Sequence, residues 1–155
     1  MCKMKWFTKI KEDKRMLANG TKLSYKKSGE NTFTDFTGLK EIPELGADPE
    51  KVENTVLSDT IKKYEIGIGD AGDLSYKFKY ENNSASSPYR VMRACAASKE
   101  VVSFKETLPD GTVYAYDAQV SVKRGGGGVN GVMEFTLTMY LQSEITVTDP
   151  SGNGG

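Results

Sequence analysis

Four consecutive glycines, Gly125 to Gly128 in the stretch KRGGGGVNG, have the composition of a loop that could hold phosphate. Such a loop needs a helix after it, whose N-terminus adds backbone amides and the positive end of the helix dipole. Here no Gly-Lys-Ser/Thr follows, and the residues on both sides alternate between apolar and polar as strands do. We therefore interpret KRGGGGVNG as a mobile hairpin loop, where a neighbouring subunit can approach closely, and not as a phosphate site or a domain linker.

The other reactive side chains form no catalytic constellation. The sequence has no histidine, so neither Cys2 nor Cys95 has the usual base that activates a thiol. Asp70 and Asp73 lie near glycines, but their spacing lacks the alternating ligands and the terminal glutamate of a calcium loop. The sequence therefore favours a protein that is not an enzyme, and it predicts no cofactor and no metal.

Amphipathic strands and one helix must position any functional surface of this chain. Alternation is clearest in the second half, in DLSYKFKYE, in the two arms of a hairpin closed by LPDGT, and in MEFTLTMYL before a short strand with Ile145 and Val147. The first half predicts short strands in TKLSYKK and NTFTDF and a third from Val52 to Leu57. Ser87 is the predicted N-cap of a helix, PYRVMRACAASK, that packs one side on the sheet.

A long polar stretch separates the short strands from DLSYKFKYE, and it contains a few isolated apolar residues. We find no periodic place for these residues in a strand. Two interpretations stay open, since long loops in compact domains are usually functional or disordered. The stretch is either an irregular connection or an arm that buries its apolar residues on another copy of the chain. The predicted contact residues are Ile42, Leu45, Ile61, Ile66 and Ile68.

The net charge of zero conceals segments of opposite charge. Residues 1–30 carry nine Lys/Arg against three Asp/Glu, residues 31–81 carry six against eleven, and residues 82–155 carry six against seven. The basic start is either a solvated arm or an arm that meets the acidic middle of another copy. Nucleic-acid binding is disfavoured because the aromatic residues do not interleave with the basic ones. The start MCKMKWFTKIK lacks the apolar core of a signal peptide, so we expect a cytoplasmic N-terminus and no membrane partner.

The order of these segments resembles the major tail tube proteins of long-tailed bacteriophages, the lambda type included. The similarity runs from GTKLSYK through LKEIPELGADPEKVENTVLSD, IGIGDAGDLSYKFKYE, a short helix and LPDGTVYAYDAQVSV to VMEFTLTMYLQSEITVT, about Thr21 to Thr148. It implies a mainly β, sandwich-like or barrel-like fold with one packed helix and a long extended loop. Residues 1–20 would be a basic arm, 21–148 the tube domain and 149–155 a flexible tail. The lysine-rich start is less typical of the family, and no immunoglobulin-like domain is expected after Thr148.

The resemblance also implies a function. Six copies would form a ring, and rings would stack into the tube through which DNA is ejected, with residues 42–72 as the loop between rings. The expected partners are further copies and other tail proteins (tape measure, terminator and distal tail), in a virion assembled in the host cytoplasm. Two alternatives remain, a neck or terminator protein that stops at one ring and an immunoglobulin-like binding or decoration module.

A channel wall along which DNA slides should carry little fixed positive charge, because each phosphate that is neutralised adds affinity. The polar faces of the two strands around the glycine loop contain two acids and no base in our assignment. We predict that they face the channel, whereas Lys77 and Lys79 face outward or a neighbouring subunit. The alternative is that the acids are ordinary solvated residues of the outer wall. The predicted channel residues are Asp117, Gln119, Ser121, Glu134, Thr136 and Thr138.

Overall fold

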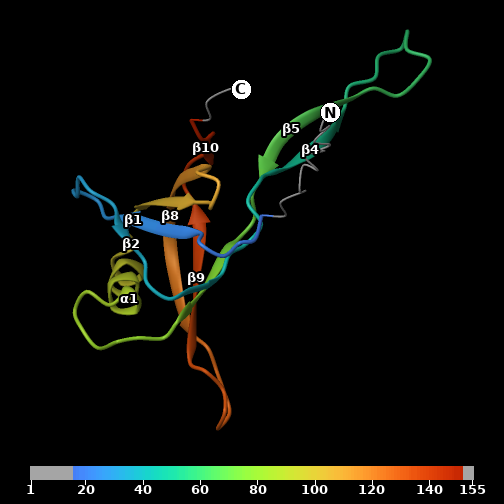
Figure 1. The fold of residues 1–155 in the computed structure, drawn as a ribbon. Helices are drawn as coiled ribbons and strands as arrows, with labels where there is room; N and C mark the ends of the chain where they lie inside the picture. Colours follow the sequence, from blue (N-terminus) through green and yellow to red (C-terminus); the bar gives the residue numbers. More distant parts are fainter. Residues whose placement is uncertain (1–15, 152–155) are drawn as a thin grey trace, which may run out of the picture.

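The structure, a computed structural model, describes residues 16–151 and contains ten strands and one helix within them (Figure 1). The predicted basic arm over residues 1–20 and the predicted tail over 149–155 fall largely outside this range. No helix within it has the length and apolarity needed to cross a membrane. In chain order, the elements are β1 Lys22–Lys26, β2 Thr34–Asp35, β3 Leu39–Glu41, β4 Asp48–Glu53, β5 Tyr64–Asp70, β6 Leu74–Lys79, α1 Pro88–Ser98, β7 Val102–Thr107, β8 Val113–Arg124, β9 Glu134–Leu141 and β10 Thr146–Thr148.

Eight strands form one antiparallel sheet, and β4 and β5 form a separate two-stranded ribbon. The order in the sheet is β2-β1-β7-β8-β9-β6-β3, with β10 beside β8. The hairpins predicted around LPDGT and around the glycine stretch are β7–β8 and β8–β9, and both are confirmed. The chain is therefore mainly β with one short helix, as predicted.

A single segment links the two edges of this sheet. Its first part, β2, pairs with β1, and the amide of Phe36 donates to the carbonyl of Leu23 at 2.8 Å. Two residues further on, the carbonyl of Gly38 accepts from the amide of Lys79 at 2.7 Å, and β3 continues along β6. The sheet is thereby curled into a barrel-like shape, and the ring of Phe36 packs inside it.

The core lies on the concave side of the curled sheet, where every second residue of the long strands is buried. Phe36 packs against Tyr25 and Phe78, with ring centroids 4.7 and 5.0 Å apart. Met92 and Cys95 of α1 are fully buried, so the predicted apolar side of the helix is confirmed. The buried strand residues are Leu74, Tyr76 and Phe78 of β6, Val102 and Phe104 of β7, Tyr116, Ala118 and Val120 of β8, and Phe135, Leu137 and Met139 of β9.

The start of α1 differs in detail from its prediction. Ser87 occupies the N-cap position, but its hydroxyl makes no capping bond to the helix. Instead it donates to Asn83 Oδ1 at 3.0 Å and accepts from the amide of Ser84 at 3.1 Å. Ser87 therefore stabilises the loop that leads into the helix, while Pro88 supplies the preset backbone angle of the first turn.

One carboxyl lies in the core where the alternation of β7 requires an apolar side chain. Glu106 is 1% exposed, and its Oε2 accepts a hydrogen bond of 2.5 Å from the hydroxyl of Tyr76. The hydroxyl of Tyr116 donates in turn to the Tyr76 oxygen at 2.8 Å. Burial raises the pKa of the Glu106 carboxyl above its ordinary value, against the opposing effect of the Tyr76 hydrogen bond. The sequence pattern gave no sign of this buried polar cluster.

The long polar stretch is more regular than predicted. Most of residues 48–70 form the β4–β5 ribbon, which projects away from the sheet (Figure 1). The strand expected from Val52 to Leu57 instead begins at Asp48 and ends at Glu53. The expectation that Ile66 and Ile68 have no periodic place in a strand is wrong, because both lie on β5 at a spacing of two.

The alternation of isoleucines on β5 is hard to recognise in the sequence because glycines alternate with them. Gly67 and Gly69 each follow one of the isoleucines, on the face of β5 that β4 and the residue before it approach closely. A Cβ on Gly67 would lie 2.9 Å from Val52 Cγ2, and a Cβ on Gly69 would lie 2.7 Å from Ala47 Cβ. The two glycines therefore let the preceding strand's side chains cross over β5, while the other face presents the isoleucines.

Candidate assembly surfaces

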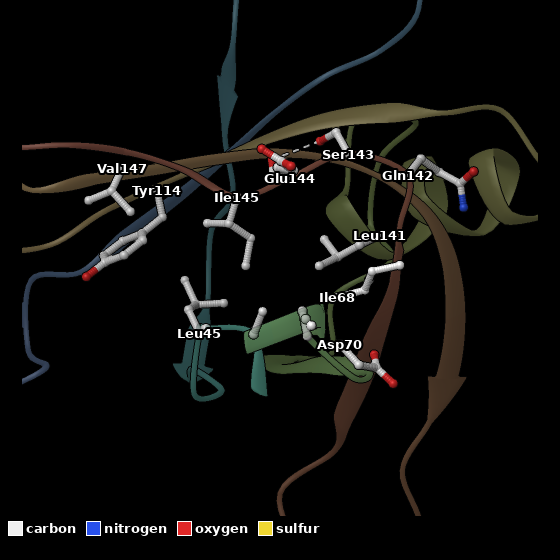
Figure 2. Close-up of a pocket in the computed structure, with 15 residues that line it drawn as sticks. Leu45, Ile68, Asp70, Tyr114, Leu141, Gln142, Ser143, Glu144, Ile145 and Val147 are labelled. Carbon is white, nitrogen blue, oxygen red and sulfur yellow. Dashed lines mark hydrogen bonds between the residues drawn. The ribbon is translucent and has the colours of Figure 1, made fainter. Parts of the chain in front are cut away.

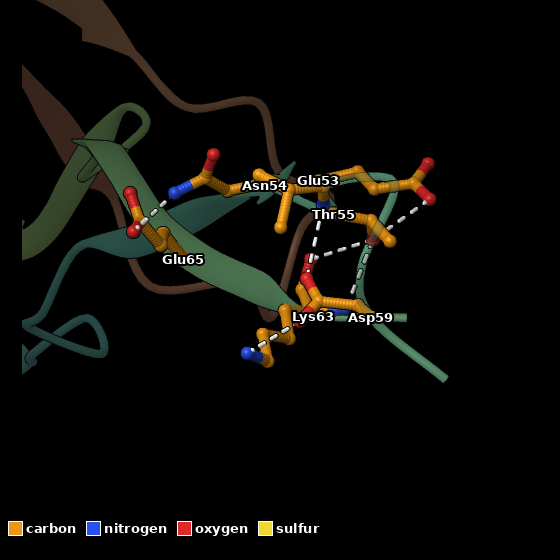
Figure 3. A network of polar contacts seen from close by, with 7 residues as sticks. Glu53, Asn54, Thr55, Asp59, Lys63 and Glu65 are labelled. Carbon is orange, nitrogen blue, oxygen red and sulfur yellow. Dashed lines mark hydrogen bonds and ion pairs between the residues drawn. The ribbon is translucent and has the colours of Figure 1, made fainter. Parts of the chain in front are cut away.

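Polar contacts hold the tip of the β4–β5 ribbon in one shape (Figure 3). The carboxylate of Asp59 accepts from the amide of Val56 at 2.9 Å and pairs with Lys63 Nζ at 2.7 Å. The hydrogen bond from Lys63 lowers the pKa of Asp59, with a smaller contribution from the Val56 amide. The hydroxyl of Thr55 accepts from the amide of Lys63 at 3.0 Å, across the turn. The tip is thus ordered by its own polar contacts rather than by packing on the core.

This ordered tip carries exposed apolar side chains. Val56 and Ile61 are exposed, and Leu57 at 109% has the accessibility of an extended chain. Exposed aliphatic side chains that gather on an ordered turn are candidates for contact with another molecule. We call Val56, Leu57 and Ile61 the tip cluster.

The predicted contact residues separate into two groups in the structure. Ile61, Ile66 and Ile68 are exposed on the ribbon, the last two at 82% and 88%. Ile42 and Leu45 are only partly exposed and pack against the chain's own core. Three of the five predicted residues are therefore exposed on the ribbon in the single subunit. The other two are partly buried against the core of their own chain.

A groove of about 1140 Å³ lies between the base of the ribbon and the strands β9 and β10 (Figure 2). Figure 2 shows Leu45, Ile68 and Ile145 directed into the same space. Its charged lining residues are Asp70 and Glu144, with no lysine or arginine among them. The full lining is Leu45, Gly46, Ala47, Gly67, Ile68, Gly69, Asp70, Ala71, Tyr114, Leu141, Gln142, Ser143, Glu144, Ile145 and Val147.

A bulge in the sheet forms one wall of the groove. β9 and β10 run along the same edge of β8, with Ala118 opposite Leu141 and Ala115 opposite Thr146. The distance from Ala115 to Ala118 is three residues on β8, whereas Leu141 and Thr146 are five residues apart. The segment between β9 and β10 therefore contains two extra residues. The amide of Asp117 donates to Ser143 Oγ at 2.8 Å and fixes this bulge. As in other sheets, the bulge changes the direction of the strand and moves side chains off the regular pleat.

The predicted channel residues lie on one polar face, opposite the core. Asp117, Gln119 and Ser121 alternate with the buried residues of β8, and Glu134, Thr136 and Thr138 alternate with those of β9. Ser103 Oγ donates to Asp117 Oδ1 at 2.7 Å, and Gln119 Nε2 donates to the carbonyl of Lys99 at 2.9 Å. The structure therefore brings the six residues together on neighbouring strands of one sheet.

The expectation that Lys77 and Lys79 lie on a different face from the predicted channel residues is wrong. β6 pairs with β9 so that Lys77 lies opposite Thr136 and Lys79 opposite Glu134. Directly opposite residues of an antiparallel pair project on the same side of the sheet. Lys123 of β8 also lies opposite Thr136, so this polar face contains bases as well as acids.

Three lysines at this face are paired with carboxylates of the same chain. Lys40 contacts Glu134, and this hydrogen bond lowers the pKa of the glutamate. Lys77 Nζ lies 3.3 Å from Glu41 Oε2, and Lys79 Nζ lies 3.5 Å from Glu81 Oε1. The first two pairs could not be predicted from the sequence, because Lys40 and Glu41 come from β3, whose position beside β6 does not follow from the pattern.

The described part of the chain offers little for metal or thiol chemistry. Among residues 16–151, no three His, Cys, Asp or Glu side chains are grouped to hold a metal ion. The thiol of Cys95 is buried and donates to Glu100 Oε1 at 3.0 Å. Burial, reinforced by this hydrogen bond, raises the pKa of Cys95 to about 12, so the reactive thiolate is disfavoured at neutral pH.

Chains of known tails and injection systems share this fold. A chain from the tail of an empty gene transfer agent particle, refined with C6 symmetry, is 20% identical with a TM-score of 0.66, over 85% of this chain and 99% of that one. A chain from the anti-feeding prophage baseplate, 6-fold symmetrised, is 14% identical with a TM-score of 0.65, over 87% and 96%. A chain from the sheath–tube complex of the extracellular contractile injection system PVC is 8% identical with a TM-score of 0.63, over 93% and 98%.

The sequence itself identifies the family. Residues 19–150 match the family described as phage tail tube protein, TTP. The chain belongs to this family, and its role is that of a structural protein of a phage tail tube. A comparison with curated proteins found no match.

Proposed function

We propose that six copies of this chain form a ring, that the rings stack into a tail tube, and that phage DNA passes through its lumen into the host. The observation that carries this proposal is the β4–β5 ribbon, which holds Ile61, Ile66 and Ile68 outside the core. Exposed apolar side chains on an ordered projection are stabilised when a second copy covers them. Membership of the tail tube family supports a second copy of this chain as the partner.

The number six is supported by two of the chains that share the fold. The gene transfer agent tail was refined with C6 symmetry, and the anti-feeding prophage baseplate was 6-fold symmetrised. A ring of identical copies closes when the rotation between neighbours divides the circle, and stacking of closed rings gives a tube. Stacking of identical rings requires that the upper and lower surfaces of each subunit differ and complement each other.

The polar face of β6, β8 and β9 is the proposed channel wall. Asp117, Glu134 and their polar neighbours lie there, and three of the nearby lysines are paired with carboxylates of the same chain. A paired lysine is less free to neutralise a phosphate, so DNA is held less strongly. The alternative location, the outer wall of the tube, places the same pairs in bulk solvent.

The proposed partners follow from this assembly. They are further copies of the chain, the tape measure, terminator and distal tail proteins, and DNA in transit. The protein would assemble in the host cytoplasm and remain in the tail of the virion. The proposed role requires no cofactor, no membrane contact and no enzymatic activity.

Electron microscopy of the purified protein tests the proposal directly. Tubes of stacked six-membered rings are expected. Single rings that never extend would instead indicate a neck or terminator protein, and monomers at high concentration would indicate a binding or decoration module.

A variant with Ile66→Asp and Ile68→Asp tests the ribbon. Both side chains are exposed in the single subunit, so the circular dichroism spectrum should stay nearly unchanged while tubes are lost. Burial of each isoleucine between copies would contribute roughly 1.5–3 kcal/mol, and every subunit of a ring repeats the defect. Tubes of wild-type length from this variant would contradict a role for the ribbon in stacking.

A further inference from the structure

The tip cluster and the groove are two apolar surfaces of the same chain that cannot meet within it. They lie at opposite ends of the ribbon: Leu57 is on the turn, and Ile68 is at the base beside β10. The six steps from Tyr64 to Asp70 span about 20 Å at the usual rise of a strand. With the ribbon intact, the tip therefore remains far from the groove of its own chain (Figure 1).

The tip cluster and the groove are both largely apolar. The tip cluster is a compact aliphatic projection, and the groove is an open space lined by Leu45, Ile68, Leu141 and other apolar side chains. Two of its lining residues, Ile68 and Val147, are exposed in the single chain. A group bound in the groove would bury them. An aliphatic projection is the kind of group that such a groove takes up.

Their charges match as well. The groove is lined by Asp70 and Glu144 with no lysine or arginine. The tip carries Lys62, whose side chain is 71% exposed and whose Nζ lies 4.0 Å from Glu53 Oε1, a weak contact. A lysine beside an inserted tip would therefore meet an acidic groove, which favours this partner over one with an acidic surface.

From these observations we propose that the tip cluster of one copy inserts into the groove between the ribbon base and β10 of a second copy in the next ring. The proposal rests on the tube function above and specifies the receptor for its ribbon. If a second copy is shifted along the direction of the ribbon by about the length of the ribbon, the groove of that copy lies beside the tip of the first. The contact is head-to-tail, so it repeats without limit along the tube.

Disulfide trapping tests the contact. In a Cys2→Ser background, a Leu57→Cys variant is mixed with a Val147→Cys variant, and tubes are assembled and then oxidised. Val147 lines the groove and is exposed, so its replacement should leave the core intact. We expect a disulfide-linked dimer from the mixture and none from either variant alone. The matched control pairs Leu57→Cys with Val132→Cys, an exposed valine outside the groove, and should give no dimer.

A charge exchange supplies a second readout. Glu144→Lys should raise the protein concentration needed for tube formation several-fold, because it places a lysine opposite Lys62 of the entering tip. Adding Lys62→Glu to the same chain restores the opposite charges and should return that concentration close to the wild-type value. Recovery in the double variant distinguishes a direct contact from a general defect of folding.

The outcomes separate this proposal from the function on which it rests. Tubes that assemble from the Leu57→Cys and Val147→Cys mixture without a disulfide-linked dimer, or an equally strong dimer from the Leu57→Cys and Val132→Cys mixture, would overturn the docking site and leave the tube function in place. A wild-type chain that forms no tubes under any condition would overturn the tube function and the docking site together.

Discussion

Glu106 shows how one residue can make the stability of this subunit depend on pH. Its carboxyl is surrounded by the core and bonded to the hydroxyl of Tyr76, and burial raises its pKa above the ordinary value of 4.5. A buried carboxylate costs free energy unless it is paired with a cation, whereas the hydrogen bond that Glu106 accepts comes from the neutral hydroxyl of Tyr76. The protonated form is therefore the one that the folded core favours.

Replacing Glu106 with Gln should remove this dependence. The pKa of Glu106 is higher in the folded chain than in the unfolded chain. The protonated carboxyl therefore contributes its full stability at a pH below the unfolded pKa. This contribution is lost as the pH rises through the folded pKa. The free energy of unfolding of the variant, relative to wild type, should therefore increase from pH 4 to pH 8. Urea denaturation of the unassembled subunit at the two pH values measures this change.

A surface carboxylate provides the control for that measurement. Glu144 is exposed, and Glu144→Gln should give the same difference from wild type at both pH values. An equal difference for Glu106→Gln at pH 4 and pH 8 would show that the carboxyl does not titrate with unfolding.

At the scale of elements, the long strands could be predicted and the ribbon could not. β6, β8 and β9 alternate because one face is buried, so their period is visible in the sequence. β5 is largely exposed on both faces and contains Gly67 and Gly69, so the short alternation of Ile66 and Ile68 was not recognised as a strand. The order of the strands could not be predicted either. Local patterns do not specify that β3 lies beside β6, so the pairs Lys40–Glu134 and Lys77–Glu41 were not expected.

The close packing of the ribbon predicts a sensitive glycine. A Cβ at Gly67 would lie 2.9 Å from Val52 Cγ2 and 3.1 Å from the carbonyl oxygen of Glu50. Gly67→Ala should therefore destabilise the ribbon by roughly 1–3 kcal/mol, the usual cost of overpacking, while the main sheet keeps its stability. Hydrogen exchange should become faster in β4 and β5 and stay unchanged in β8 and β9.

Gly126→Ala is the matched control, because no atom lies within 4 Å of the position of its Cβ. It should leave exchange in the ribbon at the wild-type rate. Unchanged exchange in β4 and β5 of the Gly67→Ala variant would mean that the two strands separate easily and do not form a rigid projection.

At the scale of the whole molecule, the chain has two unlike ends. The ribbon and the glycine loop between β8 and β9 extend from the sheet in different directions (Figure 1). Between them lies the polar face, where the acids and the paired lysines are gathered. A subunit with different ends and one polar side is suited to head-to-tail stacking around a water-filled channel.

A double variant, Asp117→Lys and Glu134→Lys, tests which way the polar face points. It adds two positive charges and removes the partner of Lys40, while both positions stay outside the core. If the face lines the channel, tubes should still assemble but DNA ejection should slow or stop, because each added phosphate contact increases the affinity for DNA. Infectivity and ejection assays on particles that carry the variant measure this.

Ejection at the wild-type rate from such particles would place the polar face on the outer wall. The control is Glu144→Lys combined with Lys62→Glu, which changes charges away from this face and should leave ejection unaffected in assembled tubes.

The segment that joins the two edges of the sheet also determines when the subunit can fold. β1 is made early but pairs with β7, about eighty residues later, and β3 must wait for β6. Such distant pairings make folding slow, commonly milliseconds to seconds. Until β7 and β9 leave the ribosome, the edges of β1 and β6 stay open, and open strand edges are where chains aggregate. Residues 34–41 therefore cannot close the sheet until β6 has been made, about thirty residues later in the chain.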